Sequence, residues 1–280
     1  MNIILAVLLS FMGQQVFSQE QINELSLPPY NQMGFIIAEA MTPRGLATRS
    51  CTGTLISRTH VLTDAHCLNF EGTWSSRISF IQGEKVRKGI NSKDRLGEGT
   101  RVKNAFLFNN YVNPQPPDAT SDGPNVVNAL RQFYSVNFDI SVFELESPVD
   151  QPGLAMASAP TVASPHCFSG FPGDLKGQLI KTCGTSANYG ANTFFGKYTP
   201  EIISLGEVTS FPGQSGAAVL NEHNAIVGVV RGQANMGAGC NPTVFISLTV
   251  RHAQEITLWM QGQTSPASQK IEISHKRIRN

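Results

Sequence analysis

The sequence predicts an all-β fold that ends in one helix. Short runs of four to eight apolar residues, many of them β-branched or aromatic, recur along the chain, and glycine, asparagine, proline or aspartate separates them. These runs do not alternate with helical patterns, as they do in chains that build a parallel sheet. Their spacing is typical of an antiparallel barrel or sandwich.

The expected strands follow one another along the chain. In order they cover residues 35–38, 51–56, 61–62, 77–82, 140–145, 208–210, 217–220, 226–230 and 244–250. The polar segment 221–224 lies between two apolar runs and predicts a hairpin turn. Residues 250–261 place large apolar side chains among polar ones, which predicts a terminal amphipathic helix. The proline-rich segment 113–135 has no such period, so we expect a long surface loop there.

Both ends of the chain depart from this pattern. An apolar run over residues 3–12 has the length of the hydrophobic part of a signal peptide and is too short to span a bilayer. Val16 and Ser18 suit a signal-peptidase site, so we expect residues 1–18 to be a signal peptide. Residues 19–32 are then a short propeptide or an N-terminal arm. We expect residues 263–280 to be a basic polar tail in solvent.

Composition narrows the classes of function. The 280 residues carry a formal net charge of +1, which gives no reason to propose nucleic acid or an anionic membrane as a partner, and we expect neither. No later segment of the sequence has the ~18 consecutive apolar residues that a transmembrane helix needs. The signal peptide therefore predicts a secreted or periplasmic protein, and we expect it to be a monomer.

The five cysteines fit that compartment, because oxidising surroundings let disulfides persist. Cys51 and Cys67 lie close in sequence and flank two apolar runs, while Cys167 and Cys183 flank a segment rich in glycine and proline. We favour the pairs Cys51–Cys67 and Cys167–Cys183, with Cys183–Cys240 as the alternative to the second. Sequence alone does not fix the connectivity.

Three segments carry the groups that nucleophilic catalysis by serine needs: an exposed hydroxyl, an imidazole base and a carboxylate that orients the imidazole. Ser215 lies between two glycines, so its turn is tight, and the amides of Gly213 and Ser215 are candidates for an oxyanion hole. His66 follows an apolar strand, inside the loop that a disulfide to Cys67 would close. Asp139 heads an apolar run, where an unpaired carboxylate is costly to bury.

Each of these signals also has a structural explanation when it is taken alone. Most Gly-x-Ser-Gly segments are ordinary turns, and a histidine before a buried cysteine is often structural. The order His66, Asp139, Ser215 in a chain of short strands favours a catalytic triad. The six histidines and five cysteines show no metal-binding spacing, so we expect no metal site and no cofactor.

The segments around these residues resemble the trypsin/chymotrypsin superfamily of serine proteases. Residues 51–56 and 61–67 are similar to its histidine region, disulfide included, and residues 139–142 are similar to its Asp-Ile-Ala-Leu motif. Residues 168–174, 213–219 and 221–228 resemble the matching segments of the glutamyl endopeptidase branch. The resemblance covers about residues 33–262.

This resemblance implies two antiparallel six-stranded β-barrels, over about residues 33–155 and 156–262, with the triad between them and a C-terminal helix. It implies a secreted serine endopeptidase that cleaves protein or peptide substrates through an acyl-enzyme. The alternative is a catalytically silent homologue that binds a partner through the cleft or through the 113–135 loop.

Two positions depart from the family's pattern. Gln214 replaces the aspartate that receives the new N-terminal ammonium in trypsin-like zymogens, so we do not expect activation by that salt bridge. The resemblance implies a specificity pocket at Ser210, Val230 and Arg231. Val230 stands where glutamyl endopeptidases have a histidine that helps bind the substrate's glutamate. Glutamate preference therefore does not follow, and Arg231 is the candidate anion partner instead.

Overall fold

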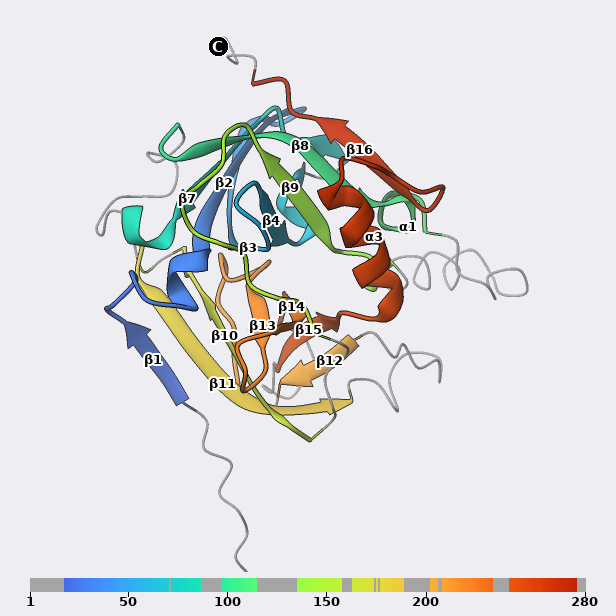
Figure 1. Ribbon diagram of the computed structural model, residues 1–280. Helices are drawn as coiled ribbons and strands as arrows, with labels where there is room; N and C mark the ends of the chain where they lie inside the picture. Colours follow the sequence, from blue (N-terminus) through green and yellow to red (C-terminus); the bar gives the residue numbers. More distant parts are fainter. Residues whose placement is uncertain are drawn as a thin grey trace, which may run out of the picture.

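The computed structural model describes residues 18–70, 72–86, 97–114, 135–157, 163–173, 175, 177–188, 202–205, 208–233 and 242–275. Within these residues the chain forms two closed, six-stranded antiparallel β-barrels and a C-terminal helix, as predicted. In Figure 1 the first barrel occupies the upper half of the molecule and the second the lower half, with the helix beside both.

The first barrel joins six strands in the order β8-β7-β2-β3-β4-β9, and the pairing of β8 with β9 closes it. A seventh strand, β16, extends the sheet at β8. The bounds are β2 Met33–Thr42, β3 Gly45–Leu55, β4 His60–Thr63, β7 Arg77–Gln82, β8 Thr100–Phe108, β9 Ser141–Leu145 and β16 Ser268–Glu272, and a small hairpin, β5 Asn69–Phe70 with β6 Thr73–Trp74, follows β4.

The second barrel joins its strands in the order β11-β10-β13-β14-β15-β12, and β11 with β12 closes it. Here too a seventh strand is added, because β1 pairs with β11. The bounds are β1 Ser18–Ile22, β10 Pro165–Gly170, β11 Leu179–Asn188, β12 Ile202–Leu205, β13 Ala218–Leu220, β14 Ile226–Gln233 and β15 Thr243–Ser247.

Helices are short and lie outside the barrels. They are η1 Tyr30–Gln32, η2 Ala65–Cys67, η3 Gly83–Lys85, α1 Asn109–Val112 and α3 Val250–Met260. Helix α3 starts at a reciprocal cap, in which the Thr249 hydroxyl accepts from the amide of His252 and the His252 ring faces the amide of Thr249. Among the described residues, no helix has the length and apolar character needed to cross a membrane.

Aromatic side chains join the two barrels and the helix. Phe35 of β2 meets Phe171, which follows β10, edge to face at 6.1 Å. Trp259 of α3 packs on Phe108 of β8, with 4.9 Å between the ring centroids. Fully burying a side chain of this size contributes about 1.5–3 kcal/mol, so these contacts help to hold the two barrels and the helix together.

The structure corrects two predictions about single segments. The expected solvated tail at 263–280 contains β16, whose Ile271 packs against the first barrel's core while Ser268 is buried. The expected strand at 208–210 is irregular chain instead. The amide of Val208 donates to Leu205 O, and Val208 O accepts from the amide of Thr243. Because the Val208 amide bonds to a residue three positions earlier in the chain, it does not take part in strand pairing.

Several other expectations can be compared with the structure directly. Both favoured disulfides, Cys51–Cys67 and Cys167–Cys183, are formed. The 221–224 turn is present, with Asn224 at a positive φ of 57° and the Asn221 side chain accepting two backbone amides. Within the arm at 19–32, residues up to Ile22 belong to β1. Residues 1–17 of the expected signal peptide, loop residues 115–134, Cys240 and tail residues 276–280 lie outside the described residues.

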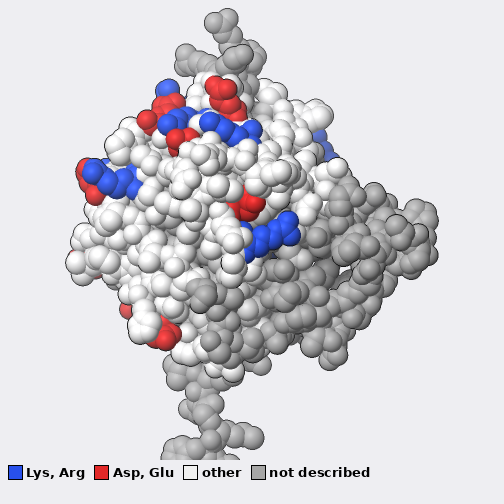
Figure 2. Space-filling view, turned by 45° about the vertical axis from the view of Figure 1, so that its right-hand side comes forward, with Lys and Arg blue, Asp and Glu red and all other residues white. Residues whose placement is uncertain are grey.

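The charged surface is mixed in sign. In Figure 2, lysine and arginine side chains lie among aspartate and glutamate over the described part of the face shown, and much of that part carries no charge. This agrees with the formal net charge of +1.

Candidate active site

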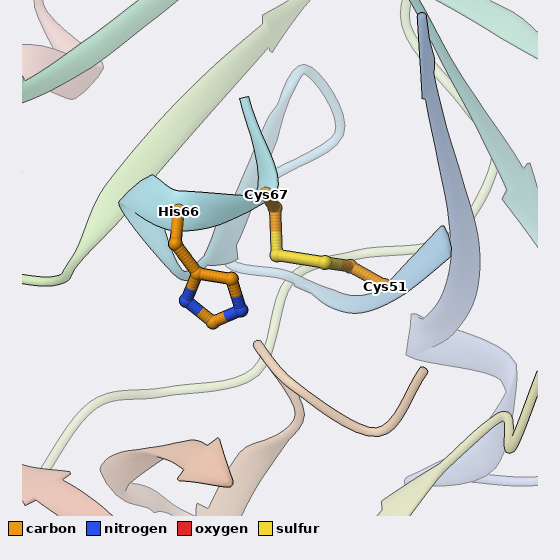
Figure 3. Close-up of side chains that lie close together, drawn as sticks. All are labelled: Cys51, His66 and Cys67. Carbon is orange, nitrogen blue, oxygen red and sulfur yellow. A yellow bond between two sulfur atoms is a disulfide. The ribbon is translucent and has the colours of Figure 1, made fainter. Parts of the chain in front are cut away.

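His66 lies where the first barrel faces the second. Strand β4 ends at Thr63, and the chain turns into η2, whose last residue, Cys67, is bonded to Cys51 of β3. Figure 3 shows the imidazole projecting from η2 beside this disulfide. The guanidinium of Arg49 donates to the backbone oxygens of His66 and Asn69, so a side chain of β3 stabilises the turn that carries the imidazole.

Asp139 holds His66 through both of its oxygens. Oδ1 accepts the backbone amide of His66 at 2.7 Å, and Oδ2 lies 2.9 Å from Nδ1 of the ring. Asp139 is fully buried two residues before β9, which pairs with β4 and so brings the two residues together. Burial opposes the charge, but His66 and Arg231 outweigh it and lower the pKa of Asp139 to about 2. The carboxylate is therefore ionised at neutral pH.

Ser215 lies on a loop of the second barrel that a residue of the first barrel ties down. The amide of Thr52 donates to Ser215 O at 2.8 Å, and the Thr52 hydroxyl donates to Gly213 O at 2.9 Å. Gly213 has a φ of 97°, and a Cβ there would lie 2.6 Å from Phe171 O, so only glycine fits. In the described chain the amides of Gly213 and Ser215 donate no hydrogen bond, as an oxyanion hole requires.

The Ser215 hydroxyl faces a backbone oxygen. Its Oγ lies 3.4 Å from Arg231 O, and within the described residues it makes no hydrogen bond to His66. Bonds between nucleophile and base are often long without a substrate and tighten when one binds. His66, Asp139 and the Ser215 loop are nevertheless brought together from three distant parts of the chain.

The three residues expected to form a specificity pocket have different surroundings. Val230 of β14 is buried in the core of the second barrel, and Ser210 is buried with its carbonyl accepting from the Gln233 amide. Arg231 points toward the first barrel, where its Nε lies 2.5 Å from Asp139 Oδ2. Its guanidinium therefore pairs with the carboxylate that also holds His66.

Gln214 supports the nucleophile loop from within the barrel. It is fully buried, its Oε1 accepts the amide of Phe211 at 2.8 Å, and its Nε2 lies 3.5 Å from Ile180 O. A neutral amide thus closes the turn before Ser215 by hydrogen bonds to the backbone. No ammonium partner is needed to shape this loop.

A second buried carboxyl, which sequence reasoning did not single out, lies beside the imidazole. Asp64 occupies the N-cap position of η2, two residues before His66, without a side-chain cap bond, and its Oδ2 is 3.6 Å from His66 Nδ1. Burial and the neighbouring charge of Asp139 raise its pKa well above the ordinary value, against Arg231 and the Gly216 amide. The only sequence signal for Asp64 was its place two residues before His66, directly after the buried strand β4.

Two groups of metal-type ligands occur among the described residues. The first contains Cys51 and Cys67, which are disulfide-bonded and offer no thiolate. The second joins Asp64, His66 and Asp139, whose ligand atoms lie within 4.8 Å of one another. Arg231 already forms an ion pair with Asp139 in this second group, so a protein side chain supplies positive charge where a metal ion would.

The chain is similar to several known proteins. The sequence model of the trypsin family matches residues 38–253. The mouse protein named Inactive serine protease 35 (Mus musculus) is 24% identical over an alignment of 260 residues that covers 77% of this chain and 61% of that protein. The chain thus spans less than two thirds of that relative's length.

Solved structures share the fold at low sequence identity. A Glu endopeptidase, solved with MPD, has a TM-score of 0.59 at 17% identity and covers 88% of this chain and 97% of its own. An inactivated protease paralogue of the scabies mite also has a TM-score of 0.59, at 15% identity, over 84% of this chain and 94% of its own. The family match extends over most of the chain and includes His66, Asp139 and Ser215, so this protein belongs to the trypsin family.

Proposed function

We propose that this protein is a serine endopeptidase with His66, Asp139 and Ser215 as its catalytic triad. The observation that carries the proposal is the double hold of Asp139 on His66, at 2.7 Å to the backbone amide and 2.9 Å to the ring. That hold fixes the ring and the tautomer with its proton on Nδ1, which leaves Nε2 to act as the base. The glycine-flanked Ser215, on a loop tied to Thr52, supports the same role.

In this mechanism Ser215 Oγ attacks the carbonyl carbon of the scissile bond while its proton passes to His66 Nε2. The oxyanion that forms accepts from the amides of Gly213 and Ser215. His66 then gives the proton to the leaving amine, the C–N bond breaks, and an acyl-enzyme remains. Water attacks the acyl carbon, His66 takes its proton, and return of that proton to Ser215 Oγ releases the acid.

Turnover of casein and of a peptide ester tests this proposal, using the natural protein and the variants Ser215→Ala and His66→Ala. We expect hydrolysis by the natural chain and a loss of roughly 10⁴-fold or more in kcat for each variant. Equal rates in all three proteins would contradict it.

A silent homologue is the second candidate, and a specific contact favours it. Arg231 pairs with Asp139 at 2.5 Å, and Ser215 Oγ faces Arg231 O at 3.4 Å without a bond to the imidazole. Two of the similar proteins are also described by their names as inactive or inactivated. Such a protein would bind peptides in the cleft without cleaving them, so binding of a casein peptide with no product formed would support this candidate.

The preference for the residue before the scissile bond is a finer proposal. Of the three pocket candidates, Ser210, Val230 and Arg231, only Arg231 is cationic, and about a third of its side chain is exposed. We infer that Arg231 favours acidic residues at this position through its exposed edge. Kinetics on peptides that vary only this residue test the inference, and equal kcat/KM for glutamate, glutamine and leucine would refute it.

Secretion is proposed from the N-terminal sequence and supported by the two disulfides. Cleavage after Ser18 would leave residues 19–22 free to remain paired with β11. Mass spectrometry of protein from the culture medium should show a chain that begins near Gln19. A chain that stays in the cell with Met1 intact would contradict the proposal.

A further inference from the structure

A polar hollow lies on the outside of the first barrel. It has a volume of about 200 Å³, and it is lined by Arg77, Ser79, Gly97, Arg101 and His275. Arg77 and Ser79 belong to β7 and Arg101 belongs to the neighbouring β8, whereas His275 follows β16. None of these residues belongs to the proposed active site, so the hollow requires its own explanation.

The alternation of β7 directs Arg77 and Ser79 away from the barrel interior. Ile78 and Phe80 of the same strand belong to the core of the first barrel, so the residues between them face the other way. Ser79 lies directly opposite Arg101 where β7 pairs with β8. Opposite residues of an antiparallel pair have neighbouring side chains, which brings this hydroxyl and this guanidinium to the same hollow.

The Ser79 hydroxyl is unusual because it is buried and unpaired. Only 3% of the residue is exposed, and within the part of the chain that the structure describes its hydroxyl makes no hydrogen bond. The large majority of buried polar side-chain atoms have a hydrogen-bond partner, because an unpaired one is costly. A molecule bound in the hollow would supply the missing partner.

The two guanidiniums of the hollow differ in their partners. Arg77 pairs at 3.0 Å with Glu39, which lies directly opposite it on β2. Arg101 is exposed, and no carboxylate among the described residues forms an ion pair with it. Lys103 of the same strand, in contrast, pairs with Glu144 at 2.9 Å. Arg101 therefore brings to the hollow a positive charge that no described carboxylate neutralises.

The chain after β16 forms a preformed wall of the hollow. The amide of His275 donates to Ser76 O at 2.9 Å, and Nε2 of its ring lies 2.6 Å from Val102 O. A carbonyl oxygen only accepts, so this ring nitrogen donates and the orientation of the imidazole is fixed. A wall that is ordered before binding reduces the entropy that a ligand would have to offset.

We propose that this hollow binds a tetrahedral oxyanion, the sulfate or phosphate group, as the free ion or as part of a larger molecule. Guanidinium groups have donors only, and the Ser79 hydroxyl can donate as well, so the hollow suits a ligand rich in acceptors. The donors come from two adjacent strands. A tetrahedral group has oxygens in several directions and can meet all of them, whereas a planar carboxylate can meet fewer. The inference does not depend on the proposed peptidase function.

Isothermal titration calorimetry of the full chain with sodium sulfate, at constant ionic strength, tests the inference. We expect one saturable site. Arg101→Gln should weaken binding by about tenfold or more, because it removes a charge-assisted hydrogen bond, and Ser79→Ala should weaken it by about fivefold. Arg101 is exposed, so its replacement should leave the fold intact. Arg58→Gln removes the same charge from an arginine that already pairs with Asp150, and this matched control should change the affinity less than about twofold.

Two further ligands identify the source of the group. Glucosamine 6-sulfate carries it on a sugar, and acetate offers a carboxylate of similar size. Binding of the sugar sulfate, lost in Arg101→Gln, supports a group on a larger molecule, whereas binding of inorganic sulfate alone supports the free ion.

Three results would overturn the inference. The first is no saturable binding of sulfate up to about 10 mM. The second is equal sulfate affinity in the natural chain and in Arg101→Gln. The third is acetate that binds as tightly as sulfate. None of these results depends on casein hydrolysis, so failure of the peptidase proposal is a separate outcome.

Discussion

Thr52 of β3 ties the loop that carries Ser215 to the first barrel. Its hydroxyl donates to Gly213 O at 2.9 Å and accepts the amide of Phe171 at 2.9 Å, and all three groups are buried. Thr52→Val keeps the shape of the side chain and removes the hydroxyl. It leaves one buried carbonyl and one buried amide without this partner, each at a cost of about 1–3 kcal/mol.

We therefore expect Thr52→Val to lower the free energy of unfolding by about 2–6 kcal/mol, measured by urea denaturation. Thr52→Ser retains the hydroxyl and should recover most of this loss. Thr48→Val, at an exposed position of the same strand, is the control for β-propensity. A Thr52→Val protein within about 0.5 kcal/mol of the Thr48→Val protein would refute the account of how the barrels are tied at the site.

Three further changes have defined outcomes. Burial lowers the pKa of His252 to about 4, so its contribution to stability is complete above about pH 6.5 and is lost as the pH falls toward 4, by up to about 3 kcal/mol. His252→Gln should therefore make the free energy of unfolding, measured by urea titration, depend less on pH over this range. An unchanged pH dependence would contradict this prediction. Gly216→Ala would put a Cβ 2.1 Å from Thr63 Oγ1, so the melting temperature should fall far more than in Gly45→Ala, whose Cβ meets nothing within 4 Å. Asp64→Asn should raise the melting temperature at neutral pH, because burial and the neighbouring Asp139 raise the pKa of this carboxyl and so disfavour its ionised form in the folded chain, whereas the unfolded chain ionises it freely; a lower melting temperature would show a structural need for the acid.

The three residues of the proposed triad could be found from the sequence because each belongs to a local pattern. Apolar runs before His66 and after Asp139, and glycines on both sides of Ser215, report on burial and tight turns, which depend on neighbours in the chain. The same holds for α3, predicted at 250–261 and observed at Val250–Met260. Patterns of this kind need no knowledge of which strands pair.

Other features depend on contacts between distant segments and left no local signal. Strand β1 joins the second barrel beside β11, and β16 returns to β8 of the first barrel, although both segments are largely polar. An edge strand with one exposed face can be polar, because its backbone hydrogen bonds to the neighbouring strand keep it in the sheet. The pairing of Arg231 with Asp139 spans 92 positions, so only the closed barrels bring the two side chains together.

Labelling with a fluorophosphonate tests the central claim, an activated Ser215, most directly. Mass spectrometry of the intact protein and of its peptides should show one covalent adduct, on the peptide that contains Ser215. We predict that Ser215→Ala abolishes the adduct and that His66→Ala slows its formation by several orders of magnitude. A natural protein that stays unlabelled, or an adduct that persists in Ser215→Ala, would contradict the account.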